Sequence, residues 1–283
     1  MMTPSTKLAE ARSFYARLLA AGVAACNPRL ERAFESIPRE AFLPPGPWHI
    51  FSAPGRRYVE TPSADPIHLY QNVLVALDVD KRINNGEPQL HAAWIAAVDP
   101  QPGETVCHIG VGTGYYSALL SFMTAPGGTL IGYEIERGLA AAAVDYLAPF
   151  EGVTVIGGDA TVEAIPPSDI IYVNAGVVSP PAGWLAALKL GGRLIFPWRP
   201  SEDIAMAVLA TRTEQGITLR PSGAAFFIPC IGASSLDGCE KAPDRLEARS
   251  IRSLWRKADR APDASAVAIY SELWFSSEEI VAE

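Results

Sequence analysis

Apolar and polar positions follow two alternating patterns through the middle of the chain. Short apolar runs alternate with segments in which apolar residues recur at helical spacing. We expect strands at 104–110, 128–134, 153–159, 168–176 and 192–198, and helices at 115–123, 137–148 and 181–190. Apolar strands that alternate with helices are typical of a parallel sheet covered on both faces. The pattern predicts an α/β fold with a doubly wound, mostly parallel sheet.

The N-terminal part follows a different pattern. Residues 5–25 have helical character, and Asn27 followed by Pro28 is typical of the start of a second helix. Residues 43–68 are rich in Pro and Gly and predict a long irregular connection. A strand at 72–80 and a helix that begins at Pro88 are expected before the core.

The C-terminal part changes character again after residue 200. We expect a hairpin on the sheet edge, then a charged helix over "DRLEARSIRSLWRKADR" (244–260) and a final strand at 266–276. We expect three regions: an N-terminal helical and loop region (1–100), a core (101–235) and a C-terminal helix–strand extension (236–283).

Composition narrows the class of protein. The chain has 283 residues, 49% of them apolar, and a formal net charge of −8. An acidic chain without a long Lys/Arg run is a poor binder of nucleic acid or of an anionic membrane. No apolar run approaches the ~20 residues that span a bilayer. The run 18–26 resembles the end of a lipoprotein signal, but the arginines at 12 and 17 favour an amphipathic helix.

Four cysteines, at positions 26, 107, 230 and 239, show no Cys-x-x-Cys spacing. No pair of histidines has the spacing of metal ligands. We therefore predict no metal, a reducing compartment and a cytoplasmic location.

The stretch "CHIGVGTGYYSALL" (107–120) carries the strongest chemical signal. Three glycines at alternate positions join an expected strand to an expected helix, where α/β sheets bind ligands. A dinucleotide site needs Gly or Ala at the position that Tyr115 occupies, so an NAD-dependent oxidoreductase is disfavoured. The spacing Gly-x-Gly-x-Gly instead resembles motif I of S-adenosylmethionine-dependent methyltransferases, which have a Rossmann-like fold.

That resemblance gives roles to residues at the ends of the following strands. Glu134 would hold the ribose hydroxyls, Asp159 would lie near the adenine amino group, and Asn174 would lie beside the transferred methyl group. Taken alone, Glu134 is also compatible with a solvated strand end, and Asp159 with a helix cap. His108 stands where many methyltransferases carry Asp or Glu, so the cofactor's amino group needs another acceptor.

Over roughly residues 28–230 the chain resembles the protein-L-isoaspartate O-methyltransferase family. The likeness rests on "IPREAFLP" (37–44), "GEPQLHA" (86–92) and "SPPAGWLAALKLGGRLIFPW" (179–198), together with the glycine turn. It implies an N-terminal addition that closes over the substrate and methyl transfer to the free carboxylate of isoaspartyl residues. It also implies an S-adenosylmethionine site formed by His91, His108, Gly110, Gly112, Gly114, Tyr115, Glu134, Ile135, Asp159, Ala160 and Asn174.

The acceptor side departs from the family pattern. Gly86 stands where the family has Ser or Thr, which predicts weak or absent activity on isoaspartyl peptides. Catalytic residues are not identified, and the acceptor-side candidates are Asn84, Asn85, Gly86 and His91. If only the hydroxyl is missing, Gly86→Ser should raise this activity. If Asn84 and Asn85 belong to a pocket rebuilt for another acceptor, Gly86→Ser should have no effect. The remaining interpretation is that Asn84-Asn85-Gly86 is only a turn.

The sequence shows no assured general base, which favours a carboxylate acceptor, because a carboxylate is already deprotonated near neutral pH. We expect an S-adenosylmethionine-dependent O-methyltransferase that acts on a carboxylate of a peptide or small molecule. The alternatives are a small-molecule O- or N-methyltransferase of the same fold and a non-catalytic S-adenosylmethionine-binding protein.

Overall fold

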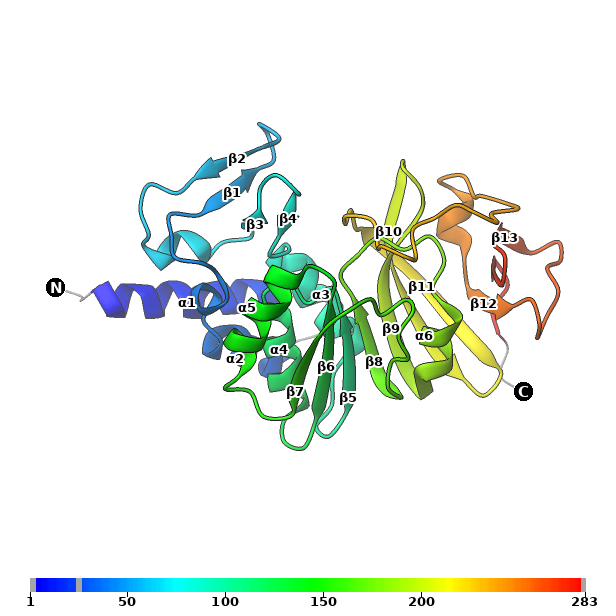
Figure 1. Cartoon of the computed structure of the whole chain (residues 1–283), viewed down its shortest axis with the longest axis horizontal. Coiled ribbons are helices and arrows are strands. Elements are labelled where there is room, and N and C mark those ends of the chain that lie inside the picture. The colour runs from blue at the N-terminus through cyan, green and yellow to red at the C-terminus, as the bar shows by residue number, and fades with distance from the viewer. Residues whose placement is uncertain (1–3, 24–26, 281–283) are drawn as a thin grey trace. The chain divides into compact units, whose positions relative to one another are not determined.

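The computed structural model describes residues 4–23 and 27–280, which form two compact units. The first unit comprises Met1–Gly103 and Val111–Gly157, and the second comprises Glu104–Gly110 and Gly158–Glu283. Figure 1 labels the elements of each unit.

The first unit combines the N-terminal helices with the beginning of the α/β pattern. Its α-helices are α1 (Pro4–Ala21), α2 (Pro28–Ser36), α3 (Pro88–Val98), α4 (Tyr115–Thr124) and α5 (Arg137–Leu147). Its strands are β1 (His49–Ser52), β2 (Arg57–Glu60), β3 (Ala76–Asp78), β4 (Ile83–Asn84), β6 (Thr129–Glu134) and β7 (Val153–Gly157), and its short 3-10 helices are η1 (Arg39–Phe42) and η2 (Pro66–Leu69). The parallel pair β6–β7 and the helices α4 and α5 match the sequence prediction.

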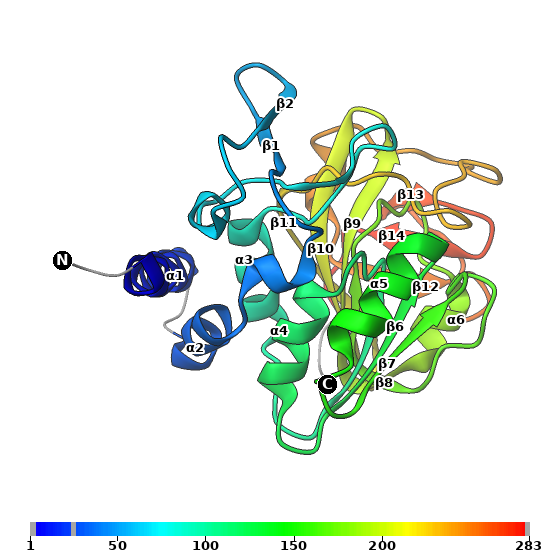
Figure 2. The same cartoon turned by 60° about the vertical axis from the view of Figure 1, so that its left-hand side comes forward.

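The start of α2 shows how the sequence determines a boundary. The Asn27 side chain accepts hydrogen bonds from the backbone N–H groups of Arg29 and Leu30, both at 3.1 Å, and Pro28 occupies the first turn. These contacts satisfy donors that a helix leaves without partners at its N-terminus. The apolar face of α2 is buried, with Phe34 edge-on to Tyr15 of α1 at 6.0 Å. Figure 2 shows α1 almost end-on beside α2.

The expected irregular connection at 43–68 contains a hairpin, so that prediction was wrong in part. Strands β1 and β2 pair antiparallel, with His49 opposite Glu60. Trp48 is buried and its Nε1 donates to Pro44 O at 2.8 Å, so this side chain anchors the connection. The strand expected at 72–80 is limited to Ala76–Asp78.

The second unit contains a sheet of parallel and antiparallel strands. Its strands are β5 (Thr105–Ile109), β8 (Ser168–Val173), β9 (Leu188–Ser201), β10 (Ile204–Thr213), β11 (Gly216–Ala224), β12 (Ser253–Arg256), β13 (Ala266–Ile269) and β14 (Leu273–Ser276), and its helices are α6 (Ala182–Ala187) and η3 (Glu247–Ser250). Strands β5, β8 and β9 are parallel neighbours, as predicted. The pairs that follow, through β10, β11, β12, β14 and β13, are antiparallel, and they include the expected hairpin β10–β11.

The C-terminal extension corrects another expectation. The charged helix predicted over 244–260 is absent from the described structure, which has there the single 3-10 turn η3 and strand β12. The expected final strand at 266–276 is a hairpin of two strands, β13 and β14. Ile251 and Leu254 are buried because β12 lies between β11 and β14, whereas Leu246 is 79% exposed.

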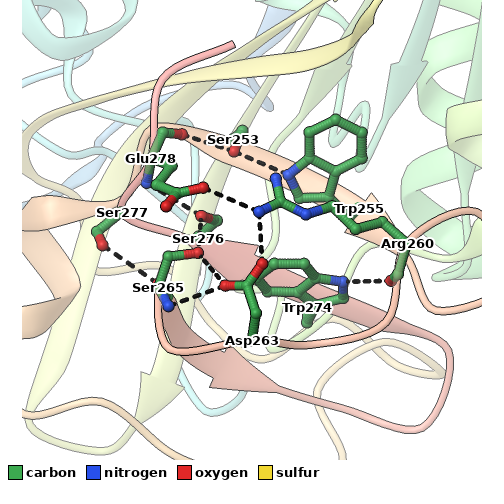
Figure 3. A network of polar contacts seen from close by, with 9 residues as sticks. All are labelled: Ser253, Trp255, Arg260, Asp263, Ser265, Trp274, Ser276, Ser277 and Glu278. Atoms are coloured by element: carbon green, nitrogen blue, oxygen red, sulfur yellow. Dashed lines mark hydrogen bonds and ion pairs between the residues drawn. The ribbon is translucent and has the colours of Figure 1, made fainter.

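The cationic side chain of Arg260 links several segments of this extension through its contacts. Figure 3 shows Arg260 between the rings of Trp255 and Trp274, with its Cζ 4.9 and 5.2 Å from the two ring centroids. The same guanidinium forms ion pairs with Asp263 and Glu278, and Trp274 Nε1 donates to Arg260 O at 2.8 Å. Cation–π contacts and charge-assisted hydrogen bonds therefore hold the strand β14 against the chain before β13.

Three further findings concern the described residues only. None of their helices is long and apolar enough to cross a membrane. Within 4–23 and 27–280, no group of three or more His, Cys, Asp or Glu side chains is placed to hold a metal ion. Cys107, Cys230 and Cys239 are free thiols, whereas Cys26 and the end of the run 18–26 lie outside the described residues.

Candidate functional site

The glycine turn follows β5. Gly110, Gly112 and Gly114 have φ angles of 80°, 60° and 99°, a region that residues with a side chain rarely adopt. Space is restricted as well, because a Cβ added at Gly114 would lie 2.8 Å from a methyl carbon of Leu147. The three glycines are therefore required by the backbone and, at Gly114, also by packing against α5.

In the first unit, Glu134 is held beside this turn. Its Oε2 accepts from the Gly112 N–H at 2.7 Å, and its Oε1 accepts from the Glu136 N–H at 2.9 Å. The side chain is only 7% exposed, and burial raises the pKa of its carboxyl while the backbone donors at Glu136 and Gly112 oppose that rise. A solvated strand end is excluded, because Glu134 is buried and fixed. The neighbouring Ile135 is 42% exposed.

Tyr115 begins α4 but directs its ring into the core. The ring is 1% exposed and packs against Phe42 and Phe34, at centroid distances of 5.7 and 6.4 Å. Arg39 Cζ lies 6.0 Å from the same ring. Any contact between Tyr115 and a cofactor would therefore come from its backbone at the helix start.

In the second unit, the buried His108 contacts the partly buried Asn174. Asn174 Nδ2 and His108 Nε2 are 2.8 Å apart, and burial lowers the pKa of His108 to about 3. The imidazole is therefore neutral near pH 7, and its Nε2 accepts the hydrogen bond from the amide. This contact orients Asn174 Oδ1, which is buried and has no hydrogen-bond partner among the described residues. A Cβ at Gly110 would lie 3.4 Å from Asn174.

Asp159 and Ala160 follow β7 in sequence and also belong to the second unit. Asp159 Oδ1 accepts from the Thr161 N–H at 2.8 Å and from Thr161 Oγ1 at 2.7 Å, so the carboxylate caps the turn after it. Its other oxygen makes no hydrogen bond within the described part of the chain. Ala160 is buried and its carbonyl accepts from Trp184 Nε1 at 2.8 Å. Asp159 therefore caps a turn and not a helix, and its role toward a ligand stays a prediction.

In the first unit, Asn84, Asn85 and Gly86 lie at the connection between β4 and α3, and His91 lies in α3. Asn84 Oδ1 accepts from the Gly86 N–H at 2.9 Å, and Asn85 Oδ1 accepts from Arg39 Nε at 3.1 Å. Gly86 has a φ of 70°, and a Cβ there would lie 2.4 Å from His91 Nε2. The His91 ring stacks on Tyr116 at 3.6 Å. Both amide oxygens are thus used within the fold, which supports the turn interpretation over a pocket built from the two amides.

Sequence reasoning missed the residue that organises this turn. Arg39 is fully buried and donates to the carbonyl oxygens of Leu69, Val73 and Gly86 at 3.1, 2.9 and 3.1 Å, in addition to Asn85. A buried guanidinium needs such partners. The motif "IPREAFLP" contained Arg39, but its partners come from segments 30 to 47 residues away.

Comparison with known proteins shows which family this chain resembles. The family model described as protein-L-isoaspartate(D-aspartate) O-methyltransferase matches residues 13–235. A protein-L-isoaspartate O-methyltransferase of Methanopyrus kandleri is 30% identical over 210 residues, which are 72% of this chain and 84% of the relative. The enzyme of the same name from Methanothermobacter thermautotrophicus is also 30% identical, over 72% of this chain and 87% of the relative.

Two solved structures share the fold. One is a protein-L-isoaspartate O-methyltransferase with a TM-score of 0.66 and 23% identity, covering 87% of this chain and 72% of that one. The other is a Plasmodium falciparum protein of the same type, solved with S-adenosyl-L-homocysteine, with a TM-score of 0.61 and 14% identity over 78% of this chain and 98% of that one. The predicted Rossmann-like α/β fold is confirmed.

Proposed function

Because the chain belongs to the protein-L-isoaspartate O-methyltransferase family, we propose that it methylates a carboxylate oxygen, with the isoaspartyl residue of a peptide as the first acceptor class. The family is one of S-adenosylmethionine-dependent methyltransferases, so the predicted enzyme class and cofactor are confirmed at that level. The family match over residues 13–235 carries the proposal.

The described residues fit this cofactor. Glu134 provides a buried carboxylate that two backbone donors hold in place, and vicinal ribose hydroxyls could donate to its remaining lone pairs. Asn174 Oδ1 is an oriented acceptor without a partner in the described structure, and an ammonium group needs acceptors. We propose that Asn174 Oδ1 binds the amino group of the cofactor. His108 cannot bind that group as the carboxylate of an Asp or Glu would.

The chemistry makes small demands on the protein. S-adenosylmethionine would supply an electrophilic methyl group on its sulfonium. In-line attack of a carboxylate oxygen on the methyl carbon, with the bond to sulfur breaking, gives S-adenosylhomocysteine and a methyl ester with no proton to move. The residues must therefore position the acceptor rather than remove a proton. A neutral His108 with its pKa lowered to about 3 is a poor base at pH 7, which is consistent with an acceptor that is already ionised.

A methyl-transfer assay tests the proposal. The protein is incubated with S-adenosylmethionine labelled in the methyl group and with an isoaspartyl peptide, its normal aspartyl isomer or no acceptor. We expect label in the isoaspartyl peptide alone. Label in hydroxyl or amine compounds instead would support the small-molecule methyltransferase. Cofactor binding without transfer to any acceptor would support a non-catalytic binding protein.

A further inference from the structure

Arg199 lies where β9 extends past the end of β8. Strand β8 ends at Val173, and the chain beyond it continues parallel to β9, with Val177 opposite Trp198. The Arg199 N–H donates to Val177 O at 2.7 Å. Arg199 is therefore at the carboxyl ends of these parallel strands, the place where open α/β sheets bind ligands.

The side chain of Arg199 is fixed between two segments of the second unit. A Cβ added at Gly176 would lie 2.5 Å from Arg199 Cδ, so the missing side chain at Gly176 makes room for the arginine stem. At the far end, Arg199 Nη1 donates to Phe227 O at 2.7 Å. The Gly176 N–H donates to Ile228 O at 2.7 Å and joins the same two segments. Asn174 precedes Gly176 by two residues, so their Cα atoms are at most about 7 Å apart.

One edge of the guanidinium has no partner. Arg199 Nε is buried without a hydrogen bond, and no hydrogen bond or ion pair of Nη2 is found among the described residues. The N–H bonds of Nε and Nη2 point to the same side, a geometry that matches the two oxygens of a carboxylate. A buried donor without a partner is unfavourable, and the guanidinium is always charged. This edge of the guanidinium therefore has the geometry and the charge to bind an anionic group.

We propose that the Nε–Nη2 edge of Arg199 binds the carboxylate of a peptide acceptor and positions it for methylation. The inference rests on the proposed function. The segment that holds Arg199 through Phe227 O also carries exposed apolar side chains, because Phe226, Ile228 and Ile231 are 68%, 43% and 59% exposed. Apolar contact beside a carboxylate site suits a peptide better than a small dicarboxylate.

The charge change of the reaction gives this contact a kinetic signature. The acceptor carboxylate is negative before transfer, and the methyl ester that forms is neutral. Arg199 would therefore bind the substrate more tightly than the product, and its contact would weaken as the transition state forms. Loss of Arg199 should consequently appear in KM rather than in kcat.

Steady-state kinetics of the full-length protein with an isoaspartyl peptide tests this signature. We expect Arg199→Ala to raise KM about ten- to a hundredfold, the effect of losing hydrogen bonds to a charged group, with kcat within about threefold of the wild type. Arg199→Lys should be intermediate, because it keeps the charge and loses the planar fork. The matched control is Arg245→Ala, which removes a 75% exposed arginine side chain and should change neither parameter.

A structural role of Arg199 would have different effects. If Arg199 had only a structural role, Arg199→Ala would lower the melting temperature and kcat, and S-adenosylhomocysteine would stabilise the variant less than the wild type. We expect Arg199→Ala to retain that stabilisation. A wild-type KM in Arg199→Ala would overturn the proposal.

An NMR titration separates this site from the choice of acceptor. The Nε–H signal of Arg199, assigned by its loss in Arg199→Lys, should shift when the isoaspartyl peptide is added to the protein with S-adenosylhomocysteine. A shift with succinate but neither a shift nor methyl transfer with the peptide would refute the isoaspartyl acceptor and retain the carboxylate site. If neither the peptide nor succinate shifts the signal, the carboxylate site is refuted even where methyl transfer occurs.

Discussion

Gly86 leaves the space that His91 occupies: a Cβ at position 86 would lie 2.4 Å from His91 Nε2, and the φ of 70° disfavours any side chain there. One interpretation of the sequence was that a serine at this position restores a family-like hydroxyl. The structure indicates that the serine would displace His91 from its stacking contact with Tyr116.

We therefore expect Gly86→Ser to lower both stability and methyl transfer. Overpacking and a left-handed backbone together predict a loss of about 1–3 kcal/mol in the free energy of unfolding. Chemical denaturation measures this loss, and Gly138→Ser is the matched control because a Cβ at Gly138 meets nothing within 4 Å. A variant that is as stable as the wild type and more active would contradict the packing argument.

His108 should make stability depend on pH. Burial lowers its pKa to about 3, so between pH 6.5 and 3 the unfolded state binds a proton that the folded state does not. Stability should fall as pH decreases through this range, with a slope of up to about 1.4 kcal/mol per pH unit from this one group.

His108→Gln should remove this component, since glutamine can accept from Asn174 without titrating. Urea unfolding at several pH values between 4 and 7 gives the slopes. His49→Gln is the matched control, because it removes an imidazole from an exposed position. Equal slopes for the wild type and His108→Gln would show that the imidazole is not buried in its neutral form.

Glu134→Ala should weaken binding of S-adenosylhomocysteine more than Asp159→Ala does. Glu134 is buried with both oxygens aligned by backbone donors, whereas one oxygen of Asp159 already caps its own turn. Two charge-assisted hydrogen bonds to the ribose are each worth roughly 1.5–3 kcal/mol. Isothermal titration calorimetry compares the two variants. Wild-type affinity in Glu134→Ala would place the ribose elsewhere.

Arg260 should stabilise the C-terminal extension without affecting catalysis, because residues 236–283 lie beyond the family match at 13–235. Loss of its contacts with Trp255 and Trp274 in Arg260→Ala should lower the melting temperature by roughly 2–6 °C. Arg256→Ala, which loses an exposed pair with Asp259, should change it less. Reduced methyl transfer in Arg260→Ala under conditions where it remains folded would indicate a role for the extension in the reaction.

The regular core was predictable because local periodicity is strongest there. The strand β5, the glycine turn and α4 follow directly from "ETVCHIGVGTGYYSALL", and Glu134 was identified by its place at the next strand end. These features depend on neighbouring residues, so one sequence is sufficient to find them.

Features that depend on distant partners were not predictable. Leu246, Ile251 and Leu254 have helical spacing, yet β12 forms because β11 and β14 supply its backbone partners. Arg39 and Arg199 resembled ordinary charged residues. Their roles become visible only when the carbonyls around Arg39 and the position of Gly176 beneath Arg199 are known.

The position of the methyl group on the product distinguishes carboxylate methylation from other methyl transfers. An isoaspartyl peptide is incubated with the protein and S-adenosylmethionine and then analysed by tandem mass spectrometry before and after mild base. We predict one added methyl group on the isoaspartyl carboxylate, lost in base as expected of an ester, and no methylation of the aspartyl isomer. A base-stable methyl group at another position, or an unmodified peptide under conditions where the cofactor binds, would contradict carboxylate methylation of isoaspartyl residues.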